Sequence, residues 1–264
     1  MVSPVSARPF PATTLVVPCY DEAGRLNVAA FTAFTASQPN VSLLFVNDGS
    51  RDGTLAVLHA IRSAAGERVD VLDLERNSGK AEAVRRGLLR ALAAGAEFVG
   101  YWDADLATPL DACLTFIELL RDRSSLEMVM GSRVLLLGRT IERRAVRHYA
   151  GRVFATAASV VLELPVYDTQ CGAKLFRASP RLAAVLDRPF LSTWLFDVEI
   201  IARFGARSSR YAPETLRTCI YEFPLLEWRD VAGSKVRARD FVRAMFDLAR
   251  IRRAYIRPGT AGGA

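Results

Sequence analysis

Lysine is scarce in this chain of 264 residues, although basic residues are abundant. Of the 35 lysines and arginines only three are lysine, namely Lys80, Lys174 and Lys235, and the formal net charge is +7. A lysine ammonium is a compact point charge, whereas an arginine guanidinium is a planar fork. A chain with so strong a bias towards arginine therefore indicates that its lysines stand where a compact cation is needed.

Cysteine, histidine and long apolar runs are also scarce, and each shortage excludes a class of protein. The four cysteines lie far apart without a C-x-x-C pair and there are only two histidines, which argues against a zinc site or a disulfide framework. The longest apolar run, residues 153–166, is too short to span a bilayer. The amino terminus lacks the pattern of a signal peptide. We therefore expect a cytoplasmic protein, which reaches a membrane only peripherally at its inner face.

The composition predicts a single α/β domain over residues 1–264. Hydrophobic residues make up 51% of the chain, which is enough to bury a full core. The ends at 1–12 and 257–264 are rich in proline, serine or glycine, and we expect them to be flexible. Residues 236–256 mix arginines with apolar residues and predict a carboxyl-terminal amphipathic basic helix.

Segments with strand character alternate with helical segments along the first half of the chain. Strands are predicted at 13–18, 41–47, 69–74 and 97–102, and helices at 25–37, 52–65, 79–94 and from Pro109 onward. This alternation with short links is typical of a Rossmann-like, mostly parallel sheet with helices on both faces. Because the carboxyl ends of parallel strands meet at one edge, the motifs after these strands should be neighbours.

Asp103 and Asp105 follow the fourth predicted strand, one residue apart. Two carboxylates this close repel each other unless a cation lies between them, and oxygen ligands suit Mg²⁺ or Mn²⁺. Such a cation would most naturally hold the phosphates of a nucleotide. A lone Asp-x-Asp is usually a solvated turn, so the reading depends on what the other strand ends carry.

The three preceding strand ends carry chemistry of the same kind. Tyr20 offers a ring on which a base can stack, and Asp48 can accept a hydrogen bond from a base. Lys80 stands at the start of a helix, where an ammonium and free N–H groups favour phosphate. Each feature alone could be a turn or a helix cap, but the ordered set of four indicates a nucleotide site. The P-loop and the Gly-x-Gly-x-x-Gly fingerprint are both absent.

This ordered set resembles the family 2 glycosyltransferases, which have the GT-A fold. Further segments at 131–133, 168–176, 194–199 and 233–235 look like dolichyl-phosphate β-glucosyltransferases, with polyprenyl-phosphate mannosyltransferases as the nearest cousins. The resemblance implies an inverting transfer of a hexose, glucose from UDP-glucose, to a polyprenyl or dolichyl phosphate, with a divalent metal.

The resemblance also implies roles for individual residues. The base and ribose would be held by Pro18, Tyr20, Glu22 and Asp48. Asp103 and Asp105 would bind the ribose, the diphosphate and the metal, with Asp105 the more direct metal ligand. Lys235 would contact the diphosphate or the acceptor phosphate. The family's eukaryotic members carry an amino-terminal membrane anchor, and the sequence gives no expectation of one here.

The acceptor decides whether the reaction needs a general base. A phosphate monoester is mostly a dianion at pH 7 and already nucleophilic, whereas a sugar hydroxyl needs a base. Asp168 is the first choice for a catalytic base, with bonding to Arg133 as its structural alternative. Asp197 and Glu199 are further candidates in a predicted helix at 194–204, where at most one of them faces the site.

A basic zone between residues 133 and 152 favours a phosphate acceptor. Arg139, Arg143 and Arg147 are spaced four residues apart and would share one helix face. Together with Arg133 and Lys174 they are the predicted acceptor and phosphate ligands, although such a face can also be merely solvated. An apolar run follows at 153–164, and cations beside an apolar surface suit a lipid phosphate at a membrane surface.

Three rival functions remain. A soluble family 2 enzyme would use a hydroxyl of a saccharide or metabolite and a carboxylate base. A sugar-nucleotide pyrophosphorylase would need a glycine-rich loop where the chain has Pro18-Cys-Tyr-Asp-Glu22. A nucleic-acid-binding module is disfavoured because the aromatics are scattered and an acidic crevice repels a phosphate backbone, so no nucleic acid is expected as a partner.

Overall fold

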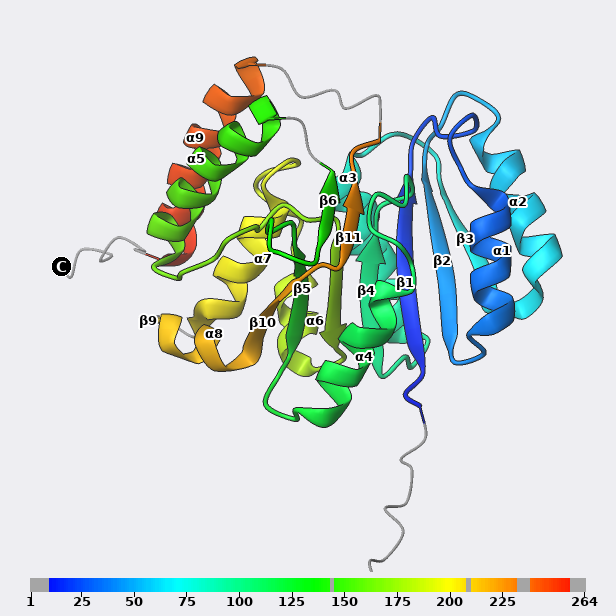
Figure 1. Cartoon of the computed structure of the whole chain (residues 1–264), viewed down its shortest axis with the longest axis horizontal. Coiled ribbons are helices and arrows are strands. Elements are labelled where there is room, and N and C mark those ends of the chain that lie inside the picture. Colours follow the sequence, from blue (N-terminus) through cyan, green and yellow to red (C-terminus); the bar gives the residue numbers. More distant parts are fainter. Residues whose placement is uncertain (1–9, 143–144, 208–209, 232–237, 257–264) are drawn as a thin grey trace, which may run out of the picture.

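The structure is a computed structural model that describes residues 10–142, 145–207, 210–231 and 238–256. Its centre is a seven-stranded sheet (Figure 1). In spatial order the strands are β10 (Ile220–Pro224), β5 (Met128–Ser132), β7 (Ala173–Arg177), β4 (Phe98–Trp102), β1 (Thr13–Cys19), β2 (Val41–Asp48) and β3 (Val69–Leu74). All neighbours pair in parallel except β7, which is antiparallel to both β4 and β5. The predicted mostly parallel sheet is confirmed.

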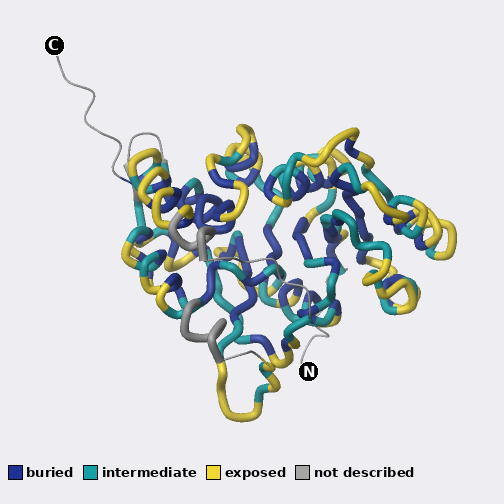
Figure 2. Tube along the Cα trace, turned by 90° about the horizontal axis from the view of Figure 1, so that it is seen from above, coloured by how far each residue is buried: buried dark blue, intermediate teal, exposed yellow. Residues whose placement is uncertain are grey.

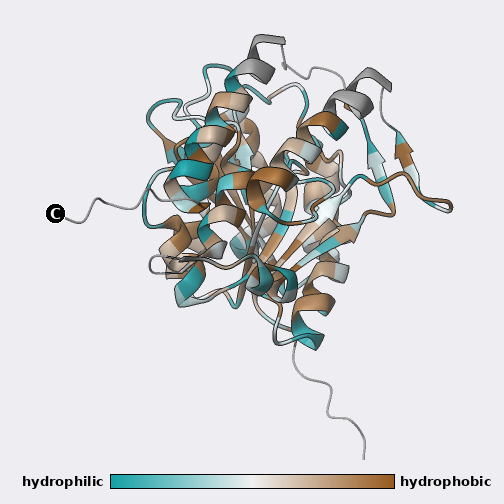
Figure 3. Ribbon diagram, turned by 90° about the vertical axis from the view of Figure 1, so that its left-hand side faces the viewer, coloured by the Kyte–Doolittle hydropathy of each residue, from teal (hydrophilic) through white to brown (hydrophobic). Residues whose placement is uncertain are grey.

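Helices cover both faces of this sheet, because successive strand residues point to opposite sides. Leu15 and Val17 of β1 join one apolar core, and Val16 joins the other. The first core includes α1 (Val28–Ser37), α2 (Thr54–Ala65) and α4 (Ala112–Asp122). The second includes α3 (Lys80–Ala93), α5 (Ala145–Leu162), α6 (Pro180–Leu186), α7 (Phe196–Gly205), α8 (Pro213–Cys219) and α9 (Ala238–Ile251). Figures 2 and 3 show the buried, apolar strands between these layers.

Short elements complete the fold. A 3₁₀ turn, η1 (Gly66–Arg68), follows α2, and a π turn, η2 (Arg252–Ile256), follows α9. A parallel two-stranded ladder joins β6 (Thr140–Glu142) to β11 (Glu227–Arg229), and an antiparallel one joins β8 (Ala206–Arg207) to β9 (Arg210–Tyr211). Helices α5 and α9 lie side by side beyond the β10 edge (Figure 1). None of the helices in the described residues has the length and apolar character needed to cross a membrane.

Several helices begin later than predicted, and the two largest delays have a local cause. The helix expected from Arg25 begins at Val28, because the side chain of Asn27 accepts a hydrogen bond from the Ala30 N–H at 3.0 Å and caps it there. The helix expected from Pro109 begins at Ala112, because residues 109–111 form a turn first.

The predicted helix face of Arg139, Arg143 and Arg147 is wrong. Arg139 lies in the turn before β6, and α5 begins only at Ala145. Residues 140–142 pair with β11, so a strand replaces the first helical turn that the four-residue spacing predicted. The three arginines therefore do not share one helix face.

Hydrogen bonds lock the ends of β1 and β2 together. The backbone N–H of Asp21 donates to Ser50 Oγ at 3.1 Å, and the Arg51 N–H donates to the Asp21 carboxylate at 2.8 Å. The Glu22 N–H donates to Thr54 Oγ1 at 2.8 Å. These bonds replace those that the backbone would otherwise make to water, so the two loops are ordered before any ligand arrives.

Gly49 permits a close approach of the third loop. Its φ is +63°, and a Cβ at this position would lie 2.4 Å from the backbone carbon of Arg76 and the nitrogen of Asn77. We expect Gly49→Ala to lower the free energy of unfolding by about 2–4 kcal/mol, since backbone strain and a clash add. The matched control is Gly66→Ala, where φ is +70° but nothing lies within 4 Å. Equal losses in urea unfolding would contradict the close approach.

Candidate active site

Asp103, Asp105 and Lys80 gather at the carboxyl end of β4 and the start of α3. Asp103 Oδ1 lies 2.5 Å from Lys80 Nζ. Asp105 Oδ1 accepts a hydrogen bond from the Ala107 N–H at 3.1 Å. Burial, followed by the charge of Asp103, raises the pKa of Asp105. Burial opposes protonation of Lys80, but the carboxylates of Asp103 and Asp197 outweigh it and raise the pKa of Lys80, which stays cationic.

The Asp103 carboxylate rests against the backbone of Gly172. The Asp103 N–H donates to the Gly172 carbonyl at 3.0 Å, and a Cβ on Gly172 would lie 1.9 Å from Asp103 Oδ2. No other residue fits there while Asp103 keeps this position. The segment 168–176 is therefore a direct neighbour of the Asp103 carboxylate.

Asp103 and Asp105 have the donor chemistry for a divalent cation. In the described parts of the chain no cluster of three or more metal-ligating side chains exists. Mg²⁺ at nucleotide sites is commonly held by one or two carboxylates, with substrate phosphates and waters as the other ligands. Burial and, after it, the charge of Asp103 raise the pKa of Asp105, and a bound cation would favour the charged carboxylate against both effects. The pair therefore fits a metal that arrives with a nucleotide.

The residues predicted to bind the nucleotide of the donor lie at the same edge of the sheet as Asp103. Pro18 lies in β1 and Tyr20 just beyond its end. Glu22 pairs with Arg25. The buried carboxylate of Asp48 accepts hydrogen bonds from the N–H groups of Ser78 and Gly79, both at 2.8 Å. Asp48 therefore also orders the loop that leads to Lys80.

Lys174 is not at the surface of this site. It is fully buried, and its Nζ donates to Asp197 Oδ1 at 2.5 Å and to the Cys171 carbonyl at 2.6 Å. The hydroxyl of Tyr101 donates to the same carboxylate oxygen. Burial and the Asp197 charge hold the pKa of Tyr101 well above its ordinary value. This corrects the expectation that Lys174 contacts an acceptor phosphate: it is a buried cation beneath the site.

Asp168 binds Arg133, which is the structural alternative to a role as catalytic base. It accepts two hydrogen bonds from the Arg133 guanidinium, at 2.6 Å from Nε and 2.7 Å from Nη2. Burial opposes the charge of Arg133, but Asp168 outweighs it and raises the pKa of Arg133. A carboxylate clamped in this way is a poor proton acceptor. Arg133 also lies 5.3 Å from the centre of the Trp228 ring.

Sequence reasoning missed Glu222, which orders the Asp168 loop from β10. Its carboxylate accepts hydrogen bonds from the N–H groups of Tyr167 at 2.9 Å and Asp168 at 2.6 Å. Burial raises the pKa of Glu222. The signal in the sequence was a single acid within the otherwise apolar run Ile220–Pro224.

Asp197 and Glu199 point to different sides of α7, as predicted. Glu199 is fully buried and accepts hydrogen bonds from the Leu191 N–H at 2.8 Å, Arg203 Nη2 at 2.7 Å and the Tyr255 hydroxyl at 2.9 Å. It ties α7 to η2, and its hydrogen-bond partners are Leu191, Arg203 and Tyr255. Arg143 and Lys235 lie outside the described residues, as does the side chain of Arg147.

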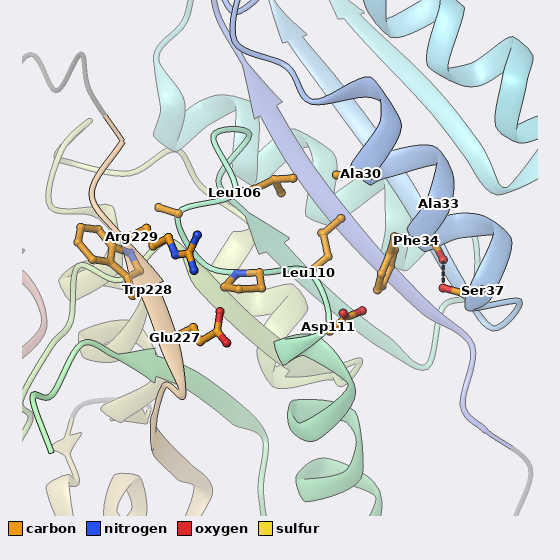
Figure 4. A pocket seen from close by; sticks show the side chains of 12 residues that line it. Ala30, Ala33, Phe34, Ser37, Leu106, Leu110, Asp111, Glu227, Trp228 and Arg229 are labelled. Carbon is orange, nitrogen blue, oxygen red and sulfur yellow. Dashed lines mark hydrogen bonds between the residues drawn. The ribbon is translucent and has the colours of Figure 1, made fainter. Parts of the chain in front are cut away.

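A groove of about 620 Å³ opens beside the carboxylates but not at them. It runs between α1, the loop after Asp105, and β11 (Figure 4). Its lining is mostly apolar: Ala30, Ala33, Phe34, Ser37, Leu106, Ala107, Pro109, Leu110, Asp111, Glu227, Trp228 and Arg229. The charged crevice around Asp103 therefore borders an apolar surface.

Residues 14–181, more than half of the chain, match the family model described as glycosyl transferase family 2. The chain belongs to this family. The resemblance drawn from the motifs is thus confirmed, and the chain is a glycosyltransferase. It is 29% identical to a dolichyl-phosphate beta-glucosyltransferase of Trichomonas vaginalis, over 97% of this chain and 77% of that protein. It is 30% identical to the enzyme of that name from Drosophila melanogaster, over 84% of this chain and 68% of the other.

Solved glycosyltransferases share the fold. Glucosyl-3-phosphoglycerate synthase from Mycobacterium tuberculosis, solved with Mn²⁺, UDP-glucose and phosphoglyceric acid, superposes with a TM-score of 0.63 at 15% identity. The match covers 96% of this chain and 83% of that one. A mannosyltransferase from Pyrobaculum calidifontis, solved with GDP-mannose and Mn²⁺, gives 0.54 at 16% identity, over 85% and 58% of the two chains. The sheet order and the expected GT-A fold therefore agree.

Substitution by methionine should mainly lower stability at Lys174 and mainly lower transfer activity at Lys80. Lys174→Met leaves Asp197 buried without its cation, so we expect a loss of about 3–5 kcal/mol in the free energy of unfolding. Lys80→Met removes a half-exposed pair and should cost less than about 1 kcal/mol, while transfer activity falls at least about tenfold. Thermal unfolding and a transfer assay on both variants separate the roles. A stable Lys174→Met protein would contradict the buried-cation assignment.

Proposed function

We propose that this chain transfers glucose from UDP-glucose to the phosphate of a polyprenyl or dolichyl lipid, with inversion at the anomeric carbon and with Mg²⁺ or Mn²⁺. The relatives named dolichyl-phosphate beta-glucosyltransferase support the donor sugar and the acceptor class. The Mn²⁺ and UDP-glucose bound by the mycobacterial synthase are consistent with the donor.

One observation favours a phosphate acceptor over a hydroxyl: all three candidate bases are already hydrogen-bonded to other side chains. Arg133 clamps Asp168, Lys174 and Tyr101 hold Asp197, and Arg203 binds Glu199. A hydroxyl acceptor would need one of these carboxylates to accept a proton. A phosphate dianion needs none, because it is already nucleophilic at pH 7. The engaged carboxylates therefore favour the lipid phosphate over the soluble hydroxyl acceptor.

The chain's own residues supply binding and orientation. Pro18, Tyr20, Glu22 and Asp48 would hold the nucleoside at the ends of β1 and β2. Lys80 and the amino terminus of α3 place positive charge beside the diphosphate, where negative charge grows as the sugar leaves. Asp103 and Asp105 would hold the cation, and when bound it neutralises charge on the departing diphosphate.

The acceptor oxygen attacks the anomeric carbon from the face opposite the diphosphate, so the product has the inverted configuration. The new bond is between the acceptor phosphate oxygen and the anomeric carbon, and the broken bond is to the diphosphate oxygen. Arg133 presents a guanidinium near this crevice, and Arg139, Arg143, Arg147 and Lys235 remain proposed contacts for acceptor or donor phosphates. The reaction would take place at a membrane surface on the cytoplasmic side.

Asp105→Ala should lower the rate of transfer steeply while the protein stays folded. Purified enzyme would receive radiolabelled UDP-glucose, Mn²⁺ and a short polyprenyl phosphate, with label followed into organic solvent. We expect metal-dependent label for the wild type and a loss of about 10²–10³-fold in Asp105→Ala. Bound UDP-glucose without any organic label would contradict the lipid-phosphate acceptor and would favour a hydroxyl acceptor.

Asp168→Asn should keep the pH profile of the wild type. We expect transfer to fall below about pH 6, because the acceptor phosphate then gains a proton and loses nucleophilicity. That acidic limb belongs to the acceptor, so it should persist in Asp168→Asn, with a rate within about tenfold of wild type. Glu199→Gln, at a buried carboxylate, controls for general destabilisation. A loss of about 10²–10⁴-fold confined to Asp168→Asn would instead identify a general base.

A further inference from the structure

The loop between β5 and β6 carries three consecutive leucines at its tip. Leu135 and Leu136 are 64% and 46% exposed, and Leu137 is fully exposed. Figure 2 shows this exposed turn projecting from the body of the molecule, and Figure 3 shows its apolar character beside β6 and β11. Single exposed apolar residues are ordinary, but a contiguous exposed group marks an interaction surface.

A fourth leucine extends the surface at the base of the loop. Leu226 is 56% exposed, and its carbonyl accepts a hydrogen bond from the Thr140 N–H at 2.9 Å. This bond and the β6–β11 ladder fix the base of the loop. We call Leu135, Leu136, Leu137 and Leu226 the leucine tip.

Arginines border the leucine tip in the sequence. Arg133 precedes it and Arg139 follows it. An apolar tip with cations at its base matches the two layers of an anionic bilayer surface, in which acyl chains lie beneath phosphates. A projecting tip also fits a deformable bilayer better than a rigid protein partner, which would need a matching cavity.

The leucine tip is attached directly to the active site. Arg133, which binds Asp168, follows the last residue of β5 and comes two residues before Leu135. When the tip enters the acyl layer, Arg133 and the crevice beside it would stand at the level of the head groups. That is the level at which the phosphate of a lipid acceptor lies.

We propose that the leucine tip inserts into an anionic bilayer and so presents the active site to lipid-borne phosphate. The inference rests on the proposed function for the identity of the acceptor. Binding to a bilayer can be measured without any acceptor, so the two can fail separately.

Helices α5 and α9 offer the competing membrane surface. Val153 and Val160 are exposed on α5, and Met245 and Phe246 are exposed on α9. These side chains are spread along two helices, whereas those of the leucine tip are consecutive and project. Val160 is 69% exposed and gives a matched site for the same substitution.

The first test is sedimentation with vesicles of phosphatidylcholine, with and without phosphatidylglycerol. We expect the wild type and Val160→Asp to bind the anionic vesicles. The double variant Leu136→Asp/Leu137→Asp should bind at least about tenfold more weakly, because it loses apolar insertion and adds repulsion. Equal binding by the double variant, or a loss confined to Val160→Asp, would overturn the proposal.

A second test follows insertion directly. Leu137→Trp places an indole at the tip, and its emission is compared with that of the wild type when vesicles with brominated acyl chains are added. We expect a blue shift and quenching beyond the wild-type change. An unquenched indole would overturn insertion. A change from dimer to monomer in the double variant, measured without lipid, would assign the leucine tip to contact with a second copy and also overturn the proposal.

A third measurement separates this inference from the proposed function. A water-soluble, short-chain prenyl phosphate is offered in the absence of vesicles. We expect the double variant to transfer glucose to it as the wild type does, and to lose at least about tenfold only with acceptor embedded in vesicles. A wild type that transfers to neither acceptor would reject the proposed function, while vesicle binding would still decide the role of the leucine tip.

Discussion

The buried ion pair between Lys174 and Asp197 is the interaction on which the rest of the active site depends. It joins β7, in the middle of the sheet, to α7 on one face, and Tyr101 of β4 bonds to the same carboxylate. Two charges without water have to be compensated closely, so this contact holds α7 against β4 and β7. This arrangement sets Gly172 against Asp103, and hence the direction in which the Asp103 carboxylate points.

Charge compensation also explains the chemistry that the site favours. Its acids divide into those tied to internal cations, such as Asp168 and Asp197, and those at the mouth of the crevice, Asp103 and Asp105. The carboxylates of the first group are already engaged by Arg133, Lys174 and Tyr101. In the second group Lys80 compensates Asp103, while burial and the charge of Asp103 raise the pKa of Asp105. A site built in this way binds charged reactants well and removes protons poorly, which agrees with a reaction between two phosphorylated partners.

Much of the donor half could be predicted from the sequence, because its signals are local. Asp48, Lys80 and Asp103 each follow a strand that its own residues define, and parallel pairing brings such ends together. Lys174 could not be assigned in this way. Whether a lysine in a strand binds a ligand or a buried acid depends on α7, which is distant in the chain. The prediction that Arg139 lies on a helix was wrong for a similar reason, because pairing of β6 with β11 overrode the local helical spacing. The projecting loop with its three adjacent leucines was missed as well.

The central place of β7 has a consequence for how the protein is made. β7 lies between β4 and β5, yet it is synthesised after both. Until residue 177 has left the ribosome, β4 keeps an unpaired edge on one side, and such an edge is prone to pair with other chains. The Asp103 carboxylate also has no Gly172 to rest on until then. The two halves of the catalytic crevice are therefore completed together, late in synthesis, by a single inserted strand.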